Sequence, residues 1–368
     1  MIPARHAGLP ILLCLLGYLA YPLSAYSQTV GTEQQNATPA NWASSYAQAG
    51  NTSDGAANAA AAQQVSPLPL TARQSQEDAW CTGPMLANSA ETLPPGHFLL
   101  EPYLYDITTA HSNSYGSRTY LLYGLADRLS VGVIPVFGYN TVSGGPSSSG
   151  IGLGDFTVQA QYRLTEFHEG SWMPTTAVMV QETFPTGKYD QLGDRLSNGI
   201  GSGAYTTTLA LNSQMYFWLP NGRILRMRFD VSEAFSHDVN IDGASVYGTT
   251  SGFHGNAKPG NALFADLSWE YSVTQRWVVA FDATYSDDRN TLVTGYNALD
   301  PNIPIPGGAQ PTHNIRQNSG SSQAFGFAPA IEYNWTPNLG VLFGTRVVLA
   351  GHNTTRTVTP AIALNYVH

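Results

Sequence analysis

Eight charged residues lie at every second position of segments whose other positions are apolar. In residues 225–231 and 263–273, charged or small polar side chains alternate with leucine, methionine, phenylalanine or tryptophan. A period of two belongs to a β-strand with unlike faces, so charges on neighbouring strands would share one polar surface. Opposite signs there, such as Arg226 and Arg228 beside Asp266 and Glu270, could form a ladder of ion pairs. The complete set is Arg163, Arg226, Arg228, Asp266, Glu270, Asp282, Glu332 and Arg346.

Two interpretations of this charged set follow from the residue types. If the strands enclose a channel, the charges would form a constriction that selects solutes by charge and size. Alternatively, they would fill the interior of a narrow barrel and neutralise one another. Both stay open, because pairing and selection are compatible.

Residues arranged for catalysis are not found in this sequence. His97 and His368 would stand at strand ends. The sequence near them shows no serine and no asparagine or glutamine at a spacing that would complete a hydrolase triad. The glycines of 150–154 lack the strand-before, helix-after setting of a dinucleotide loop, and Gly187-Lys188 lacks the other residues of a P-loop. Other histidines fall in separate loops without a close pair, which disfavours a metal site. We therefore expect no enzyme activity, no cofactor and no metal.

The elements that would carry the charged set are twelve short strands. The alternation predicts them at 97–108, 117–125, 129–139, 154–164, 174–184, 205–219, 224–235, 261–273, 276–286, 323–335, 339–349 and 356–367. Every second connection is short and contains turn formers, such as Asn221-Gly222. The other connections are longer and polar, at 109–116, 140–153, 185–204, 236–260, 287–322 and 350–355.

This regular alternation of short and long connections is typical of an outer-membrane β-barrel, with tight periplasmic turns and longer outer loops. Only 11% of the chain is charged, against about 25% in an ordinary soluble domain. No apolar run long enough for a membrane helix exists outside the N-terminus. The sequence therefore predicts an all-β, transmembrane, antiparallel up-and-down barrel of about twelve strands, with both termini on the periplasmic side.

The same alternation assigns side chains to lipid or to the lumen. In the strand at 154–164, Phe156, Val158 and Tyr162 would face lipid, whereas Asp155, Thr157, Gln159, Gln161 and Arg163 would face the lumen. The loop at 287–322 is long enough to fold inward as a constriction or outward as a binding surface. The sequence does not decide between these.

The N-terminal region divides by composition. Residues 1–27 resemble a secretory signal peptide, with a short apolar core and small residues before Gln28. Residues 28–92 form a low-complexity periplasmic tail. The first part of this tail has too few large apolar side chains to fold. Within the tail the denser stretch at 80–92 could plug the barrel, and residues 93–368 would form the barrel itself. Cleavage of the signal would leave Cys81 as the one cysteine.

Several short motifs resemble a known family. Residues 89–98, with the sequence SAETLPPGHF, precede Glu101-Pro102, and GLGDF at 152–156 leads to QYRL at 161–164; ETFPTG follows at 182–187. These segments resemble the "MetA-pathway of phenol degradation" putative transporter family over residues 89–368. The resemblance implies an outer-membrane channel with a link to the uptake of aromatic compounds. The resemblance does not assign a ligand contact to any residue of this chain.

We therefore expect passive uptake or efflux of small, aromatic or hydrophobic molecules across the outer membrane of a Gram-negative bacterium. The alternative is a non-conducting structural or adhesin-like barrel that acts through its extracellular loops. Expected partners are outer-membrane lipids, small-molecule solutes and the barrel assembly machinery. The net charge of −9 and the lack of a basic stripe argue against nucleic acid.

Overall fold

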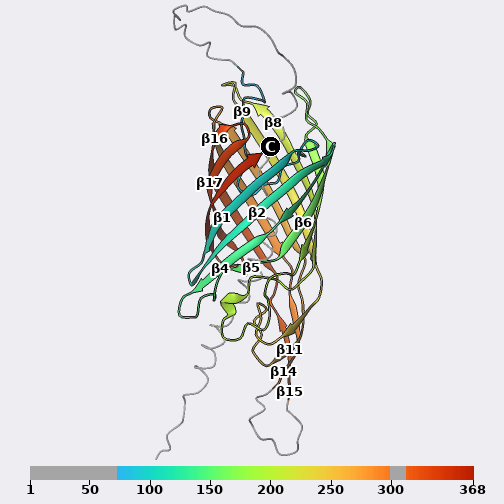
Figure 1. Ribbon diagram of the computed structural model, residues 1–368, viewed down its shortest axis with the longest axis vertical. Coiled ribbons are helices and arrows are strands. Elements are labelled where there is room, and N and C mark those ends of the chain that lie inside the picture. Colours follow the sequence, from blue (N-terminus) through green and yellow to red (C-terminus); the bar gives the residue numbers. More distant parts are fainter. Residues whose placement is uncertain (1–72, 299–311) are drawn as a thin grey trace, which may run out of the picture.

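The computed structural model describes residues 73–298 and 312–368, so the expectations for a signal peptide and for residues 28–72 lie outside the described residues. Within them the chain is mostly β-strand (Figure 1). The strands are β1 (Phe98–Thr108), β2 (Ser112–Ala126), β3 (Leu129–Ile134), β4 (Val136–Val142), β5 (Gly152–Leu153), β6 (Phe156–Thr165), β7 (Thr175–Phe184), β8 (Thr206–Trp218), β9 (Ile224–Ser236), β10 (Val239–Asp242), β11 (Phe253–Lys258), β12 (Ala262–Ser272), β13 (Trp277–Asp288), β14 (Leu292–Ala298), β15 (Thr312–Asn318), β16 (Ser322–Thr336), β17 (Leu339–His352) and β18 (Thr357–Val367).

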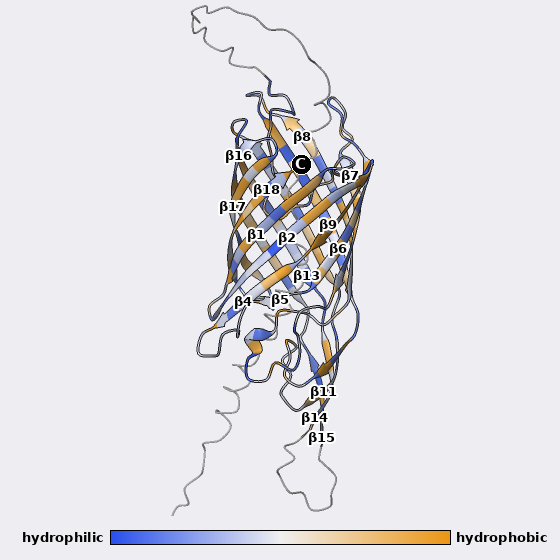
Figure 2. Cartoon of the chain, in the orientation of Figure 1, coloured by the Kyte–Doolittle hydropathy of each residue, from blue (hydrophilic) through white to orange (hydrophobic). Residues whose placement is uncertain are grey.

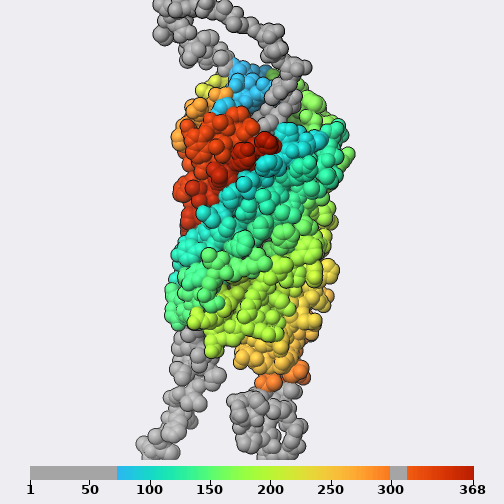
Figure 3. Space-filling view, in the orientation of Figure 1, coloured from blue at the N-terminus to red at the C-terminus, as the bar shows by residue number. Residues whose placement is uncertain are grey.

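The wall is a closed antiparallel barrel of twelve strands. Its order is β1-β18-β17-β16-β13-β12-β9-β8-β7-β6-β3-β2, and pairing of β1 with β2 closes the circle. The strand made of β3 and β4 is interrupted at Pro135, and that of β5 and β6 at Gly154 and Asp155. In the face shown by Figure 3, the C-terminal strands lie directly beside β1. Closure leaves no unpaired edge in the membrane, which a lipid environment requires.

The prediction of fold class is confirmed, and all twelve predicted strands are present with bounds shifted by a few residues. The largest differences are that β2 begins at Ser112 rather than at 117, and that β17 continues to His352. The short connections join strands at one end of the barrel, where the C-terminus also lies (Figure 1).

Four strands were not predicted, because they lie in segments interpreted as loops. β10 and β11 follow β9, and β14 and β15 follow β13; together they form a separate sheet in the order β10-β11-β14-β15. Figure 1 shows this outer sheet projecting beyond the barrel at the end away from the C-terminus. The described part of residues 287–322 thus runs outward, while residues 299–311 lie outside the described residues.

Side chains alternate between lipid and lumen as the period of two predicts. Along β12, alternate residues from Ala262 to Ser272 are buried and those between them are partly exposed. Figure 2 shows the resulting alternation of hydrophobic and hydrophilic positions along the wall strands. Aromatic pairs lie near both ends of β13: Trp277 is 4.7 Å from Tyr333, and Tyr285 is 4.9 Å from Phe325, between ring centroids. No helix among the described residues is long and apolar enough to cross a membrane.

Candidate functional site: the lumen and its inner segment

All eight residues of the charged set point into the lumen. Seven are buried: Arg226, Arg228, Asp266, Glu270, Asp282, Glu332 and Arg346. The eighth, Arg163, keeps 18% of its side chain exposed near the periplasmic end of β6. Alternation along β6, β9, β12, β13, β16 and β17 places them there, because each occupies an inward position.

A segment without regular secondary structure fills part of this lumen. Residues 79–93, the inner segment, precede β1 and are almost all buried, including Cys81, Leu86 and Ala90. An irregular backbone cannot satisfy its own N–H and C=O groups, and leaving them unpaired at membrane depth costs several kcal/mol each. The lumen must therefore supply their hydrogen-bond partners.

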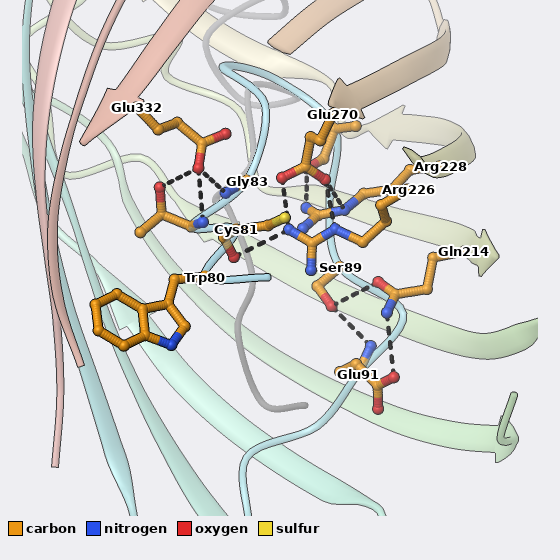
Figure 4. Close-up of polar contacts among 12 residues, drawn as sticks. Trp80, Cys81, Gly83, Ser89, Glu91, Gln214, Arg226, Arg228, Glu270 and Glu332 are labelled. Carbon is orange, nitrogen blue, oxygen red and sulfur yellow. Dashed lines mark hydrogen bonds and ion pairs between the residues drawn. The ribbon is translucent and has the colours of Figure 1, made fainter. Parts of the chain in front are cut away.

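Three luminal acids accept the backbone N–H groups of the inner segment. Glu332 Oε2 accepts from Thr82 N at 2.7 Å, from the Thr82 hydroxyl at 2.6 Å and from Gly83 N at 3.3 Å (Figure 4). Asp282 accepts from Met85 N at 3.0 Å and from Ala87 N at 3.2 Å. The third acid, Asp230, accepts from Asn88 N.

Luminal donors bind the carbonyl groups of the same segment. Arg226 donates to Cys81 O at 3.1 Å, and Arg228 donates to Ala87 O at 3.0 Å. Further bonds run from Asn334 to Trp80 O at 2.5 Å and from Gln161 to Ser89 O and Glu91 O, at 2.9 and 2.7 Å. The polar wall thus takes the place of a β-ladder for this backbone.

Glu270 joins the two arginines of β9. Its carboxylate accepts from Arg226 Nε at 2.6 Å and from Arg226 NH2 at 2.5 Å, and it lies 3.3 Å from Arg228 Nε (Figure 4). Such a two-point pair holds both the position and the plane of the guanidinium group. Asp266, the other acid considered for this ladder, receives no hydrogen bond on either oxygen.

The inner segment also carries a charge of its own. Glu91 accepts from Arg163 NH1 at 2.9 Å, from Gln214 at 3.1 Å and from the Thr175 hydroxyl at 3.3 Å. These bonds fix its C-terminal part to β6, β7 and β8 near the periplasmic end.

Several luminal residues were missing from the charged set. Glu101, Arg118 and Asp230 are buried inward residues of β1, β2 and β9; the alternation places Asp230 inward beside Arg226 and Arg228, and its strict use would also have found Glu101 and Arg118. Glu91 could not be found in this way, because its segment has no period and its partners come from distant strands.

An apolar cluster also lines the lumen. In it, Met85 and Leu86 of the inner segment pack on side chains from β1, β2, β3, β13, β16, β17 and β18. Its members on the wall are Tyr103, Tyr120, Ile134, Ala280, Ala328, Ala330, Leu342, Ala361 and Ala363. The same part of the wall carries Asp282, Glu332 and Arg346, so apolar and charged side chains line the lumen on shared strands.

The wall is irregular where β3 passes into β4. Ile134 pairs with Thr157 of β6, but the next pairs are only Phe137 with Leu153 and Gly138 with Gly152. Pro135 interrupts the strand there, and a proline cannot donate to a ladder. A hydrogen bond from Gly154 N to Val136 O at 2.8 Å spans the interruption, and the pairing of β4 with β5 beyond it is short.

Asp155 lies in the interruption between β5 and β6. Its carboxylate accepts from Gly187 N at 3.0 Å and from Ser202 N and the Ser202 hydroxyl, both at 2.7 Å. These bonds hold the connection at 185–204, whose Ile200 lies against Gly138 and Gly152 at the irregular wall.

Among the described residues, no group of three or more His, Cys, Asp or Glu is arranged to hold a metal ion.

A closed, even-stranded barrel with an apolar outer face and a polar, filled lumen defines a transmembrane β-barrel of the kind found in Gram-negative outer membranes. Within this class, the chain belongs to the family described as "Putative MetA-pathway of phenol degradation", whose model matches residues 83–366. The resemblance read from the short motifs is thereby confirmed.

Solved structures are similar to this chain at low sequence identity. The COG4313 outer membrane channel from Pseudomonas putida F1 is 17% identical, with a TM-score of 0.55, over 76% of this chain and 98% of that one. The Ralstonia pickettii toluene transporter TbuX is 11% identical, with a TM-score of 0.30, over 74% of this chain and 90% of that one. Among curated proteins, none matches the chain.

Proposed function

We propose that this protein is an outer-membrane channel for the passive passage of small, aromatic or hydrophobic molecules, and that it is not an enzyme. The observation that carries the proposal is the inner segment, which the lumen holds by side-chain hydrogen bonds and ion pairs rather than by a strand ladder. Such contacts can be exchanged for water or solute without breaking the barrel. The charged set would then hold this closure instead of forming an open constriction.

The chemistry of the solute is supported by two further facts. The apolar cluster of the lumen, with Tyr103, Tyr120 and several alanines, offers a surface for an aromatic or hydrocarbon body. The family description refers to phenol degradation, and the P. putida relative is named an outer membrane channel. Passage sideways through the irregular wall at Pro135 would deliver an apolar molecule without crossing the whole lumen.

Liposome swelling tests this function. Refolded protein with and without residues 28–92 would be compared for the entry of small neutral solutes, phenol among them. We expect slow entry with the full chain and faster entry without the segment. If neither form admits any solute, the channel function is wrong. Because the shortened chain could misfold, the full-length double variant Glu332→Ala with Asp282→Ala serves as a second test of release.

A second candidate function rests on the outer sheet. β10, β11, β14 and β15 enclose a buried cluster with Val239, Ile241 and Phe253, so this part is a folded body and not a set of loose loops. It suits the alternative of an adhesin-like barrel that acts through its outer surface. If no form of the protein admits solute, and altering this sheet abolishes surface binding, that alternative is favoured.

A further inference from the structure

Five polar atoms on three neighbouring strands lack a hydrogen-bond partner in the described part of the chain. They are both carboxylate oxygens of Asp266, one oxygen of Asp230, and the hydroxyls of Ser268 and Thr284. All four side chains are at least 95% buried, with Asp266 1% exposed and Ser268 fully buried. Buried polar groups are nearly always satisfied, so such a cluster requires an explanation.

Strand register brings these groups together. Asp266 on β12 lies directly opposite Asp230 on β9 and opposite Thr284 on β13. Ser268, the next inward residue of β12, lies opposite Asp282 on β13. Side chains opposed in this way have their Cβ atoms about 4.5–5.5 Å apart, so the unpartnered oxygens border one luminal patch. We call Asp230, Asp266, Ser268 and Thr284 the acceptor patch.

The inner segment leaves these five atoms without a hydrogen-bond partner. It binds the other oxygen of Asp230 through Asn88 N, and it binds Asp282 through Met85 N and Ala87 N. Arg228 is engaged with Glu270 and with Ala87 O. Arg228 and Arg346 act on Asp266 through charge alone, without a hydrogen bond to its oxygens.

Charge around the lumen favours a positive guest. Buried charged residues of the described wall comprise six acids and four arginines, namely Glu101, Asp230, Asp266, Glu270, Asp282 and Glu332 against Arg118, Arg226, Arg228 and Arg346. A desolvated carboxylate is stabilised by a cation that also donates hydrogen bonds. An ammonium group has three donors and no acceptor, which matches carboxylates and hydroxyls that need donors.

The apolar cluster of the lumen begins beside the acceptor patch. Ala328 on β16 lies opposite Asp282, and Phe264 is the inward neighbour of Asp266 on β12; both are buried. A molecule with an amine at one end and a hydrocarbon or aromatic body at the other would therefore meet matching surfaces.

We propose that the acceptor patch binds the protonated amine group of a permeating molecule, with Asp266 as its main contact. This inference rests on the proposed channel function and adds to it a preference for cationic over neutral or anionic amphiphiles. Asp266 would then be a specificity-determining residue rather than part of the bonds that hold the inner segment.

Two measurements test the acceptor patch. In planar bilayers, reversal potentials under gradients of butylammonium chloride and of sodium butyrate give the preference for cations. In thermal unfolding of the full chain, butylammonium should raise the transition temperature, whereas butanol and butyrate should not, because only a ligand of the folded state stabilises it. The second measurement requires no conduction.

The variants are Asp266→Asn, which keeps the shape of the side chain, and Ser268→Ala. We expect Asp266→Asn to lower the cation preference by about tenfold, as loss of a charge-assisted bond would, and to abolish the butylammonium shift. Ser268→Ala should have a smaller effect in the same direction. Asp106→Asn is the control, because Asp106 stands on the outward side of β1 and bonds Asn113 and Thr108.

The outcomes separate this inference from the proposed function. Conduction without cation preference, or an unchanged preference and thermal shift in Asp266→Asn, would overturn the acceptor patch and leave the channel standing. A thermal shift that depends on Asp266, without conduction in any form of the protein, would support the patch and overturn the channel. Equal effects of Asp266→Asn and Asp106→Asn would show that net charge alone is responsible, which also overturns the patch.

Discussion

Glu332 is the residue whose loss should most directly loosen the inner segment. One of its oxygens accepts three hydrogen bonds from Thr82 and Gly83. Hydrogen bonds to charged groups contribute about 1.5–3 kcal/mol each. Because water replaces part of these bonds in Glu332→Ala, we expect a net loss equal to about one of them, which raises the population of the released segment about tenfold to a hundredfold, since 1.4 kcal/mol is a factor of ten.

Labelling of the native cysteine, Cys81, measures this release, so no further cysteine has to be introduced. Its thiol is buried, and burial raises the pKa of Cys81, so little thiolate is available to react. Labelling by a maleimide should be slow in the wild type and faster in Glu332→Ala. Glu182→Ala is the matched control, because Glu182 lies on the outward side of β7 and bonds Thr207. Equal labelling rates in the two variants would contradict the role of Glu332.

Leu267 tests which side of the wall faces lipid. It is an outward residue in the middle of β12. Arginine facing lipid at mid-depth costs about 2–4 kcal/mol, and about 0–1 kcal/mol near an interface. Leu267→Arg should therefore lower the unfolding free energy in bilayers far more than Leu225→Arg, whose site lies one residue from the periplasmic end of β9. Similar losses at both positions would contradict the assigned depth.

At the scale of elements, the connection at 185–204 depends on Asp155. Its carboxylate accepts three hydrogen bonds from Gly187 and Ser202, at the two ends of that connection. Asp155→Ala should free the connection, and trypsin should cut after Lys188 or Arg195 about tenfold faster in intact proteoliposomes.

Asp194→Ala is the control for this cleavage, because Asp194 is an exposed residue of the same connection. If both variants are cut at the wild-type rate, Asp155 does not hold the connection in place.

The elements also show what could be predicted from the sequence. The twelve wall strands follow from a period of two, because a strand with lipid on one side and polar lumen on the other must alternate. The same reasoning placed Arg226, Arg228 and Glu270 inside. Their bonds to the inner segment could not be predicted, because that segment has no period and its partners lie 140 or more positions away.

Irregular geometry explains the remaining differences. The strand breaks at Gly154 and Asp155, so the bonds of Asp155 to Gly187 and Ser202 do not follow from the period. The strands of the outer sheet are short, from four to seven residues, and are separated by Gly, Asn and Ser. Their apolar positions pack on each other through register between β10, β11 and β14, which no local pattern reveals.

Across the whole molecule, the luminal polar side chains and the apolar cluster have different tasks. The polar side chains hold the backbone of the inner segment, and the apolar cluster packs on Met85 and Leu86. A solute that displaces the segment must replace both kinds of contact. An amphiphile does so better than either a purely polar or a purely apolar molecule, which connects the closure of the barrel with the acceptor patch.

Closure of the wall leads to a prediction for the molecule as a whole. Because β1 pairs with β18 as well as with β2, detergent cannot begin to separate the wall strands at a free edge. Unheated protein in dodecyl sulfate should therefore stay compact and migrate differently from boiled protein on a gel. A chain with Pro substituted at Tyr103 should lose this difference, since Tyr103 pairs with Ala363 and Arg118 at the closing seam and a proline cannot donate to the ladder. If the wild-type mobility does not change on boiling, the strands do not form a closed barrel in detergent.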